Sequence, residues 1–136
     1  MEQRLNLVTL VVTDLDRTRR FYVEGLGWQP ALDVPDEVLM FHVGQKLVLS
    51  FWHERAAATE IGPVTRGGTP PFTLAHNCDG PEEVDAVLAD ARRAGAEVTP
   101  AQARDWGGYS GYFSDPDGFH WEVAHNPHPI GEVLLP

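Results

Sequence analysis

The sequence predicts an α+β fold built from two βαβββ modules whose strands form curved, mixed sheets. The same order of apolar strand-like segments and one amphipathic helix occurs in each half of the chain. The glycines that end the two helices, Gly27 and Gly95, are offset by about as much as Gly44 and Gly118, the glycines of the last two hairpins. Similar offsets at both ends indicate an internal duplication.

The first half begins with an apolar, β-branched strand over 5–12, and Asp14 follows as a helix N-cap. Apolar residues recur at near-helical spacing as far as Leu26, and Gly27 ends the helix. Turn residues then separate three short strands, which we expect at 28–34, 38–43 and 47–52. Glycine and proline are frequent in 55–71, which predicts a linker or an exposed loop.

The second half repeats this order, with a strand over 72–78 and Pro81 in the first turn of a helix. The helix carries an apolar stripe formed by Val84, Val87, Leu88 and Ala91. Three strands follow at 97–103, 109–114 and 119–125. We therefore expect a single domain over 1–136, with module one at about 5–54, a linker at about 55–71, module two at about 72–125 and a C-terminal tail at 126–136.

Composition limits the classes of partner and location. The net charge of -10 disfavours nucleic acid and anionic lipid as partners. No apolar run approaches the roughly 20 residues needed to span a bilayer, and the N-terminal residues do not resemble a signal peptide. The single cysteine, Cys78, cannot form an intrachain disulfide and is expected to be a buried, unreactive thiol. We expect a cytoplasmic protein.

The turn Asp115-Pro116-Asp117-Gly118 is the most informative local motif. Proline presets φ at the second position, aspartate caps the backbone and glycine takes the left-handed position. Such a turn determines the register of the strand that follows it. In that strand we expect Trp121 and its apolar neighbours to pack on the helices, and His120, Glu122 and Ala124 to line the opposite, concave face.

These segments resemble a known family. The paired βαβββ order, Asp14-Leu15-Asp16, Phe21-Tyr22, Leu26-Gly27-Trp28 and 115–122 are similar to the vicinal oxygen chelate superfamily, whose fold is shared by glyoxalases, bleomycin resistance proteins and dihydroxybiphenyl dioxygenases. The resemblance covers nearly the whole chain. It implies the fold and a homodimer, but one fold can support many chemistries.

The resemblance also implies positions for the four ligands of a divalent metal. They fall at Leu7, at Val48 or Leu49, at Phe72 or Thr73, and at Glu122. Only Glu122 can ligate a transition metal, so three of the four usual positions are non-ligating and we expect no cofactor. A divalent metal held by another set of residues is the alternative, although the six histidines show no recognised ligand spacing on one element.

The sequence allows more than one interpretation of the roles of Glu122, Trp52 and Trp106. Glu122 is interpreted as a general acid or base, as a polar anchor for a ligand, or as a structural group within the sheet. Trp52 and Trp106 are interpreted as walls of a pocket or as packing residues, and the glycines after Trp106 allow close approach.

The preferred hypothesis is a glyoxalase/bleomycin-resistance-like protein that binds a small organic molecule in a concave groove without the usual metal set. The alternative is an enzyme of the same superfamily, a lyase, isomerase or dioxygenase that uses Glu122 with or without a divalent metal. A structural or regulatory module is a third option. The groove is predicted to be lined by Leu7, Thr9, Val48, Ser50, Trp52, Thr73, Trp106, His120 and Glu122.

Overall fold

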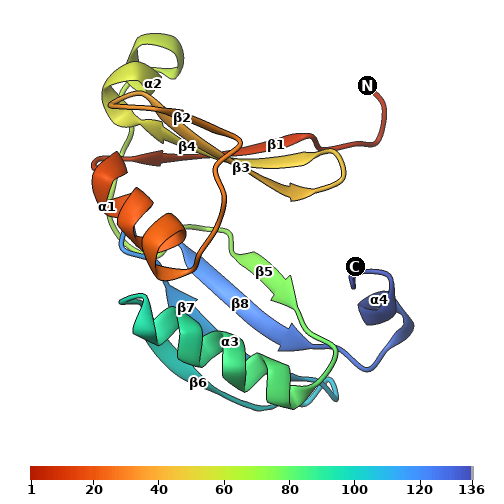
Figure 1. The fold of residues 1–136 in the computed structure, drawn as a ribbon. Helices are drawn as coiled ribbons and strands as arrows, with labels where there is room; N and C mark the ends of the chain where they lie inside the picture. The colour runs from red at the N-terminus through yellow and green to blue at the C-terminus, as the bar shows by residue number, and fades with distance from the viewer. Residues whose placement is uncertain (136) are drawn as a thin grey trace. The chain divides into compact units, whose positions relative to one another are not determined.

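The computed structural model describes residues 1–135 and divides the chain into two compact units, Met1–Gly67 and Gly68–Pro136. The boundary falls inside the glycine- and proline-rich stretch 55–71. Each unit holds a four-stranded sheet, with strand order β1-β4-β3-β2 in the first and β5-β8-β7-β6 in the second (Figure 1). The two orders are equivalent, which confirms the predicted pair of βαβββ modules.

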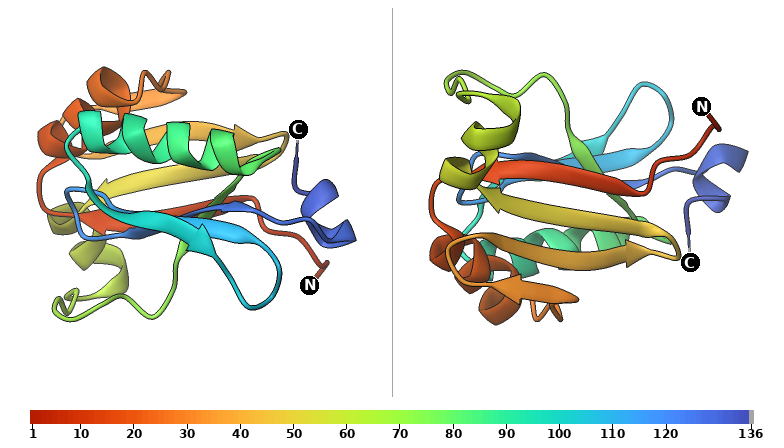
Figure 2. Two further views of the ribbon diagram at one scale, coloured as in Figure 1. Left: turned by 90° about the horizontal axis from the view of Figure 1, so that it is seen from below. Right: turned by 90° about the horizontal axis from the view of Figure 1, so that it is seen from above.

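The first unit has a mixed sheet. Strand β1 is parallel to β4, whereas β3 is antiparallel to both β4 and β2. Figure 2, right, shows the four strands side by side with β1 at one edge. The elements are β1 (Leu7–Val12), α1 (Leu15–Arg19), the π-helical turn η1 (Arg20–Gly25), β2 (Leu32–Val34), β3 (Val38–Gly44), β4 (Leu47–His53) and α2 (Glu54–Ile61).

The first helix begins where the sequence predicts. The Asp14 carboxylate accepts a hydrogen bond from the Arg17 backbone N–H at 2.9 Å, as an N-cap does. The helix widens in η1, and Gly27 follows it with a φ of 75°. The strand expected over 28–34 is limited to Leu32–Val34, because the ring of Trp28 packs into the core instead and Pro30 has no backbone N–H to donate.

Tyr22 lies at the centre of the core of the first unit. Its ring is fully buried, with its centroid 4.6 Å from that of Phe51 and 5.9 Å from that of Phe41. Strand alternation places Phe41 and Phe51 on the same sheet face, beneath the first helix. The opposite face of this sheet therefore carries the other set of side chains.

Helix α2 occupies part of the stretch that the sequence analysis expected to be a linker or loop. His53 caps it, because its imidazole Nδ1 accepts a hydrogen bond from the Arg55 backbone N–H at 3.1 Å. Three consecutive alanines at 56–58, which favour helix, follow the first two residues of the helix, and Gly62 ends it with a φ of 85°. The prediction of a linker or loop was wrong for 55–61, because it weighed the glycines and prolines of 62–71 and overlooked an unusual histidine cap.

The second unit matches the predicted elements more closely. Strands β6 and β7 have the predicted bounds, whereas β5 and β8 are shorter than predicted. A short helix, α4, lies within the predicted tail. The elements are β5 (Leu74–Asn77), α3 (Pro81–Arg93), β6 (Glu97–Ala103), β7 (Tyr109–Ser114), β8 (His120–His125) and α4 (Pro129–Glu132).

Helix α3 covers one face of the second sheet, where it packs on β6, β7 and β8 (Figure 1). Val84, Leu88 and Ala91 of the predicted stripe are buried. The helix sits close to the sheet at Gly111, where a Cβ atom would lie 2.6 Å from a Leu88 methyl carbon. A side chain at this position would therefore collide with both the helix and strand β6.

The Asp115–Gly118 turn joins β7 to β8 as the sequence predicts. The Asp115 carboxylate is buried, and one oxygen accepts hydrogen bonds from the backbone N–H groups of Asp117 and Phe119, both at 2.9 Å. Gly118 takes a φ of 87° and donates its N–H to the Asp115 carbonyl at 3.0 Å. These bonds close the hairpin and set the pairing of β7 with β8.

Within residues 1–135, none of the helices has both the length and the apolar character required to cross a bilayer.

Replacing Asp115 with Ala should lower the free energy of unfolding by about 1–3 kcal/mol, because the Phe119 N–H would lose its partner in a buried place. Urea unfolding followed by tryptophan fluorescence measures this change. The control is Asp105→Ala at an exposed turn residue, for which we expect a change within about 0.5 kcal/mol. Equal stability of the two variants would contradict the role assigned to Asp115.

Candidate functional site

The face of the second sheet opposite α3 carries three consecutive cross-strand pairs between β7 and β8. They are Ser114 with His120, Tyr112 with Glu122, and Ser110 with Ala124. Trp121 and Val123 alternate with these residues and are buried on the α3 side, as the sequence predicts. The three pairs form a row, which we call the polar row.

Glu122 and Tyr112 are joined at the centre of the polar row. The Tyr112 hydroxyl donates a hydrogen bond to Glu122 Oε1 at 3.0 Å. Both side chains are half-buried. Burial raises the pKa of Tyr112, and the hydrogen bond and negative charge of Glu122 raise it further. The phenol therefore keeps its proton and remains a donor to the carboxylate at neutral pH.

Arg104 holds the tyrosine from the other side. It follows β6, and its Nε and Nη2 donate to the hydroxyl and the carbonyl oxygen of Ser110, both at 2.9 Å. The guanidinium carbon lies 5.7 Å from the centroid of the Tyr112 ring, within the range of a cation–π contact. The ring of Tyr112 is thus held by Arg104 and its hydroxyl by Glu122.

Sequence reasoning missed both Tyr112 and Arg104. A signal for Tyr112 was present, since the predicted hairpin places it across from Glu122 once the turn at 115–118 is assigned. No comparable signal identified Arg104, because it lies beyond the end of β6 and reaches the row only through its long side chain.

His120 lies one pair away from Glu122. Its Nδ1 is 3.4 Å from the Ser114 hydroxyl oxygen, which is a long contact. Thr73 donates its hydroxyl to the His120 carbonyl at 3.0 Å, so this residue joins the start of β5 to β8. The structure therefore brings three predicted site residues together within the second unit: Thr73, His120 and Glu122.

Two small side chains lie beside Glu122. Ala75 of β5 is its cross-strand partner on the side away from Tyr112, and Ala75 is exposed. Ala124 lies two residues along β8 on the same face. Neither methyl group can reach over the carboxylate, so these two neighbours leave Glu122 uncovered.

Trp106 lies in the loop between β6 and β7 and is 43% exposed. Its ring covers Gly108, where a Cβ atom would lie 1.7 Å from a ring carbon. Its carbonyl oxygen is 2.7 Å from His128 Nε2. The close approach that the sequence analysis expected at this glycine is made by the tryptophan itself.

The five predicted site residues of the first unit share one sheet face. Leu7 pairs with Val48, Thr9 with Ser50, and Val11 with Trp52, so these residues lie opposite the core face that carries Phe51. Leu7 is 45% exposed, whereas Ser50 is fully buried. This face is therefore more apolar than the polar row of the second unit.

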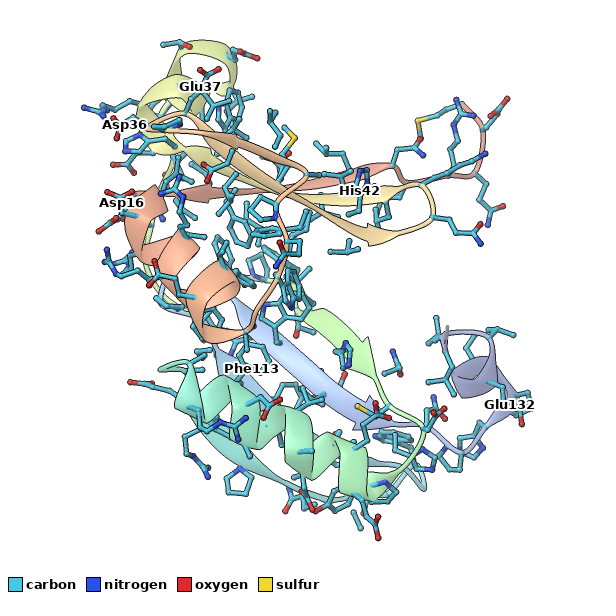
Figure 3. All side chains as sticks on the ribbon, in the orientation of Figure 1. Asp16, Asp36, Glu37, His42, Phe113 and Glu132 are labelled. Atoms are coloured by element: carbon cyan, nitrogen blue, oxygen red, sulfur yellow. The ribbon has the colours of Figure 1, made fainter. Side chains whose placement is uncertain are left out.

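His42, His125 and Cys78 lie outside the polar row. His42 extends from β3 (Figure 3) and is exposed. His125 Nδ1 lies 3.3 Å from the Cys78 carbonyl oxygen. Burial is the main cause that raises the pKa of the Cys78 thiol to about 11, so this thiol is not a nucleophile at neutral pH.

The side chains at the family's ligand positions do not fit a transition metal. Leu7 and Val48 are cross-strand neighbours without donor atoms, and Oε1 of Glu122 already accepts the Tyr112 hydroxyl. Over residues 1–135, no group of three or more His, Cys, Asp or Glu side chains is placed to hold a metal ion.

Comparison with known proteins identifies the class. Residues 4–123 match the family model of the Glyoxalase/Bleomycin resistance protein/Dioxygenase superfamily. A glyoxalase-related enzyme from Fulvimarina pelagi is 34% identical, with a TM-score of 0.83, over 93% of this chain and 90% of that chain. The chain thus belongs to the Glyoxalase/Bleomycin resistance protein/Dioxygenase superfamily, which confirms the resemblance seen in the sequence.

More distant structures share the fold. A lactoylglutathione lyase from Agrobacterium tumefaciens is 23% identical with a TM-score of 0.70, over 92% of this chain and 95% of that chain. The fosfomycin resistance protein FosX from Mesorhizobium loti is 16% identical with a TM-score of 0.70, over 98% and 99% of the two chains. Comparison with curated proteins gave no match.

Replacing Glu122 with Gln should lower the pKa of Tyr112, because the carboxylate charge that helps to keep the phenol protonated is removed. Part of the elevation should persist, since burial is its largest cause. NMR of tyrosine labelled at Cζ follows the titration of each ring separately. In the matched variant Asp85→Asn, the pKa of Tyr109 should fall instead, because Asp85 accepts the Tyr109 hydroxyl. A Tyr112 titration that is unchanged by Glu122→Gln would refute the coupling.

Proposed function

We propose that the protein binds a small organic molecule on the face of the second sheet that carries the polar row, without a bound transition metal. The observation that carries this proposal is the half-buried Glu122 carboxylate, which is held by Tyr112 on one side and flanked by small side chains on the other. A fixed polar group beside open space can orient a ligand.

Three further features support a ligand site. The polar row places hydroxyl, imidazole and carboxylate groups on adjacent pairs of one rigid hairpin. The Asp115 turn holds that hairpin in register. In addition, the side chains of Leu7 and Val48, at two of the other family ligand positions, have no donor atoms, which favours binding over metal-assisted chemistry. The predicted homodimer and the predicted cytoplasmic location stay predictions, and sedimentation analysis would measure the first.

An enzyme of the same superfamily is the second candidate. The observation in its favour is the Tyr112–Glu122 hydrogen bond, because a carboxylate and a phenol 3.0 Å apart can exchange a proton with a bound substrate. The similar protein from Fulvimarina pelagi is described as an enzyme. Turnover of a ligand found by screening, abolished in Glu122→Gln, would favour this candidate over a binding protein.

Glu122→Gln should weaken binding of ligands found by an NMR screen of small organic molecules by about tenfold, the size of one hydrogen bond to a charged group. In the wild-type protein, ligands should shift the amide resonances of 110–114 and 120–124. The control is Glu82→Gln on α3, the helix that covers the opposite face, which should leave the affinity unchanged. Shifts confined to another region would refute the proposed site.

After dialysis to remove unbound metal, the purified protein should contain far less than one equivalent of zinc, nickel, iron or manganese per chain. Elemental analysis measures this content, and calorimetry with each ion tests added metal. Glu122→Gln should not alter either result, because the carboxylate is not acting as a ligand. One equivalent of tightly bound metal in the wild-type protein, lost in Glu122→Gln, would overturn the metal-free proposal.

A further inference from the structure

We infer that Tyr112 is a specificity-determining residue that makes the polar row select ligands with an ammonium group over ligands with an amidinium or guanidinium group. The inference rests on the proposed function and names the ligand class of the same site. It follows from how the two carboxylate oxygens of Glu122 are used.

One oxygen of Glu122 is already occupied. Tyr112 donates its hydroxyl to Oε1 at 3.0 Å. Over the described residues 1–135, Oε2 has no hydrogen-bond partner and the carboxylate takes part in no ion pair. The half-buried carboxylate therefore carries a negative charge that the rest of this unit does not directly neutralise, with one oxygen available.

Tyr112 cannot easily release the oxygen that it occupies. Arg104 lies over its ring, and Arg104 is itself fixed by two hydrogen bonds to Ser110. Rotating the tyrosine away would disrupt the cation–π contact as well as its hydrogen bond to Glu122. The hydroxyl thus acts as a fixed occupant of Oε1.

Cationic groups differ in how many carboxylate oxygens they use. An amidinium or guanidinium group is a planar fork whose two parallel N–H bonds match both oxygens of a carboxylate. An ammonium group is a compact charge that can donate to one oxygen. The Tyr112 hydroxyl takes one of the acceptor positions of Oε1, so a fork that donates to both oxygens has to share Oε1 with the hydroxyl, which weakens one of its two bonds. An ammonium group can donate to Oε2 alone.

Charge and space are consistent with a cationic ligand. The chain carries a net charge of -10, which attracts cations. Ala75 and Ala124 leave the side of Glu122 away from Tyr112 free of large side chains. Arg104 adds local positive charge, but it affects an ammonium and an amidinium group of equal charge alike, so it does not alter the preference between them.

The test compares benzylamine with benzamidine, two probes that share an aromatic ring and a single positive charge at pH 7. Each is titrated by NMR into the wild-type protein, Tyr112→Phe and Glu122→Gln. The wild-type protein should bind benzylamine more tightly. In Tyr112→Phe the affinity ratio should shift toward benzamidine by about tenfold, the size of one hydrogen bond between charged groups. Both probes should bind weakly to Glu122→Gln.

The matched control is Tyr109→Phe. It also removes a tyrosine–carboxylate hydrogen bond from β7, but this bond joins the strand to Asp85 of α3, and the affinity ratio should not change. Spectra of each free variant establish that it is folded.

The outcomes separate the two proposals. A ratio that is unchanged in Tyr112→Phe overturns the role of Tyr112, while weakened binding in Glu122→Gln still supports the proposed site. If neither probe shifts the resonances of 110–114 and 120–124, the selectivity for ammonium groups is overturned, and the screen with uncharged molecules decides the proposed function independently.

Discussion

The two hydrogen bonds that the Asp115 carboxylate accepts determine how the second unit presents its side chains. They close the turn before β8 and so set the register of β8 against β7. A slip of one residue would move Glu122 beneath α3 and bring Trp121 to the opposite face. A buried carboxylate at one end of a hairpin thus controls the placement of another carboxylate seven residues later.

Most of the fold could be predicted from the sequence, because its determinants are local. Asp14 as a cap, Pro81 in a first turn and glycine at 118 each act within a few residues, and the structure confirms all three. The errors have a different origin. Helix α2 depends on an imidazole cap, which is rare. The strand expected over 28–34 is shortened to Leu32–Val34, and Trp28 packs against Tyr22 instead, a contact made through the tertiary structure.

The candidate site was predicted in part. Strand parity was sufficient to place His120 and Glu122 on one face, and the shared face of Leu7, Thr9, Val48, Ser50 and Trp52 follows from the same parity. Side-chain partners could not be predicted in this way. The bond from Tyr112 to Glu122 depends on register and rotamer together, and Arg104 reaches Ser110 from outside any strand. The place of Trp106 in a groove stays a prediction, and its own ring fills the space beside Gly108.

The close contact at Gly111 has a consequence for motion in the second unit. Gly111 lies between Ser110 and Tyr112, and the Leu88 side chain of α3 presses directly on its backbone. Because α3 packs closely on β7 at this position, we expect strand β7 to loosen only together with α3. We therefore expect the amides of 110–112 to exchange with solvent as slowly as the core, in contrast to the mobile loops on which many ligand-binding residues are found. The polar row is therefore expected to be a rigid surface, and the proposed ligand would have to fit it without local rearrangement.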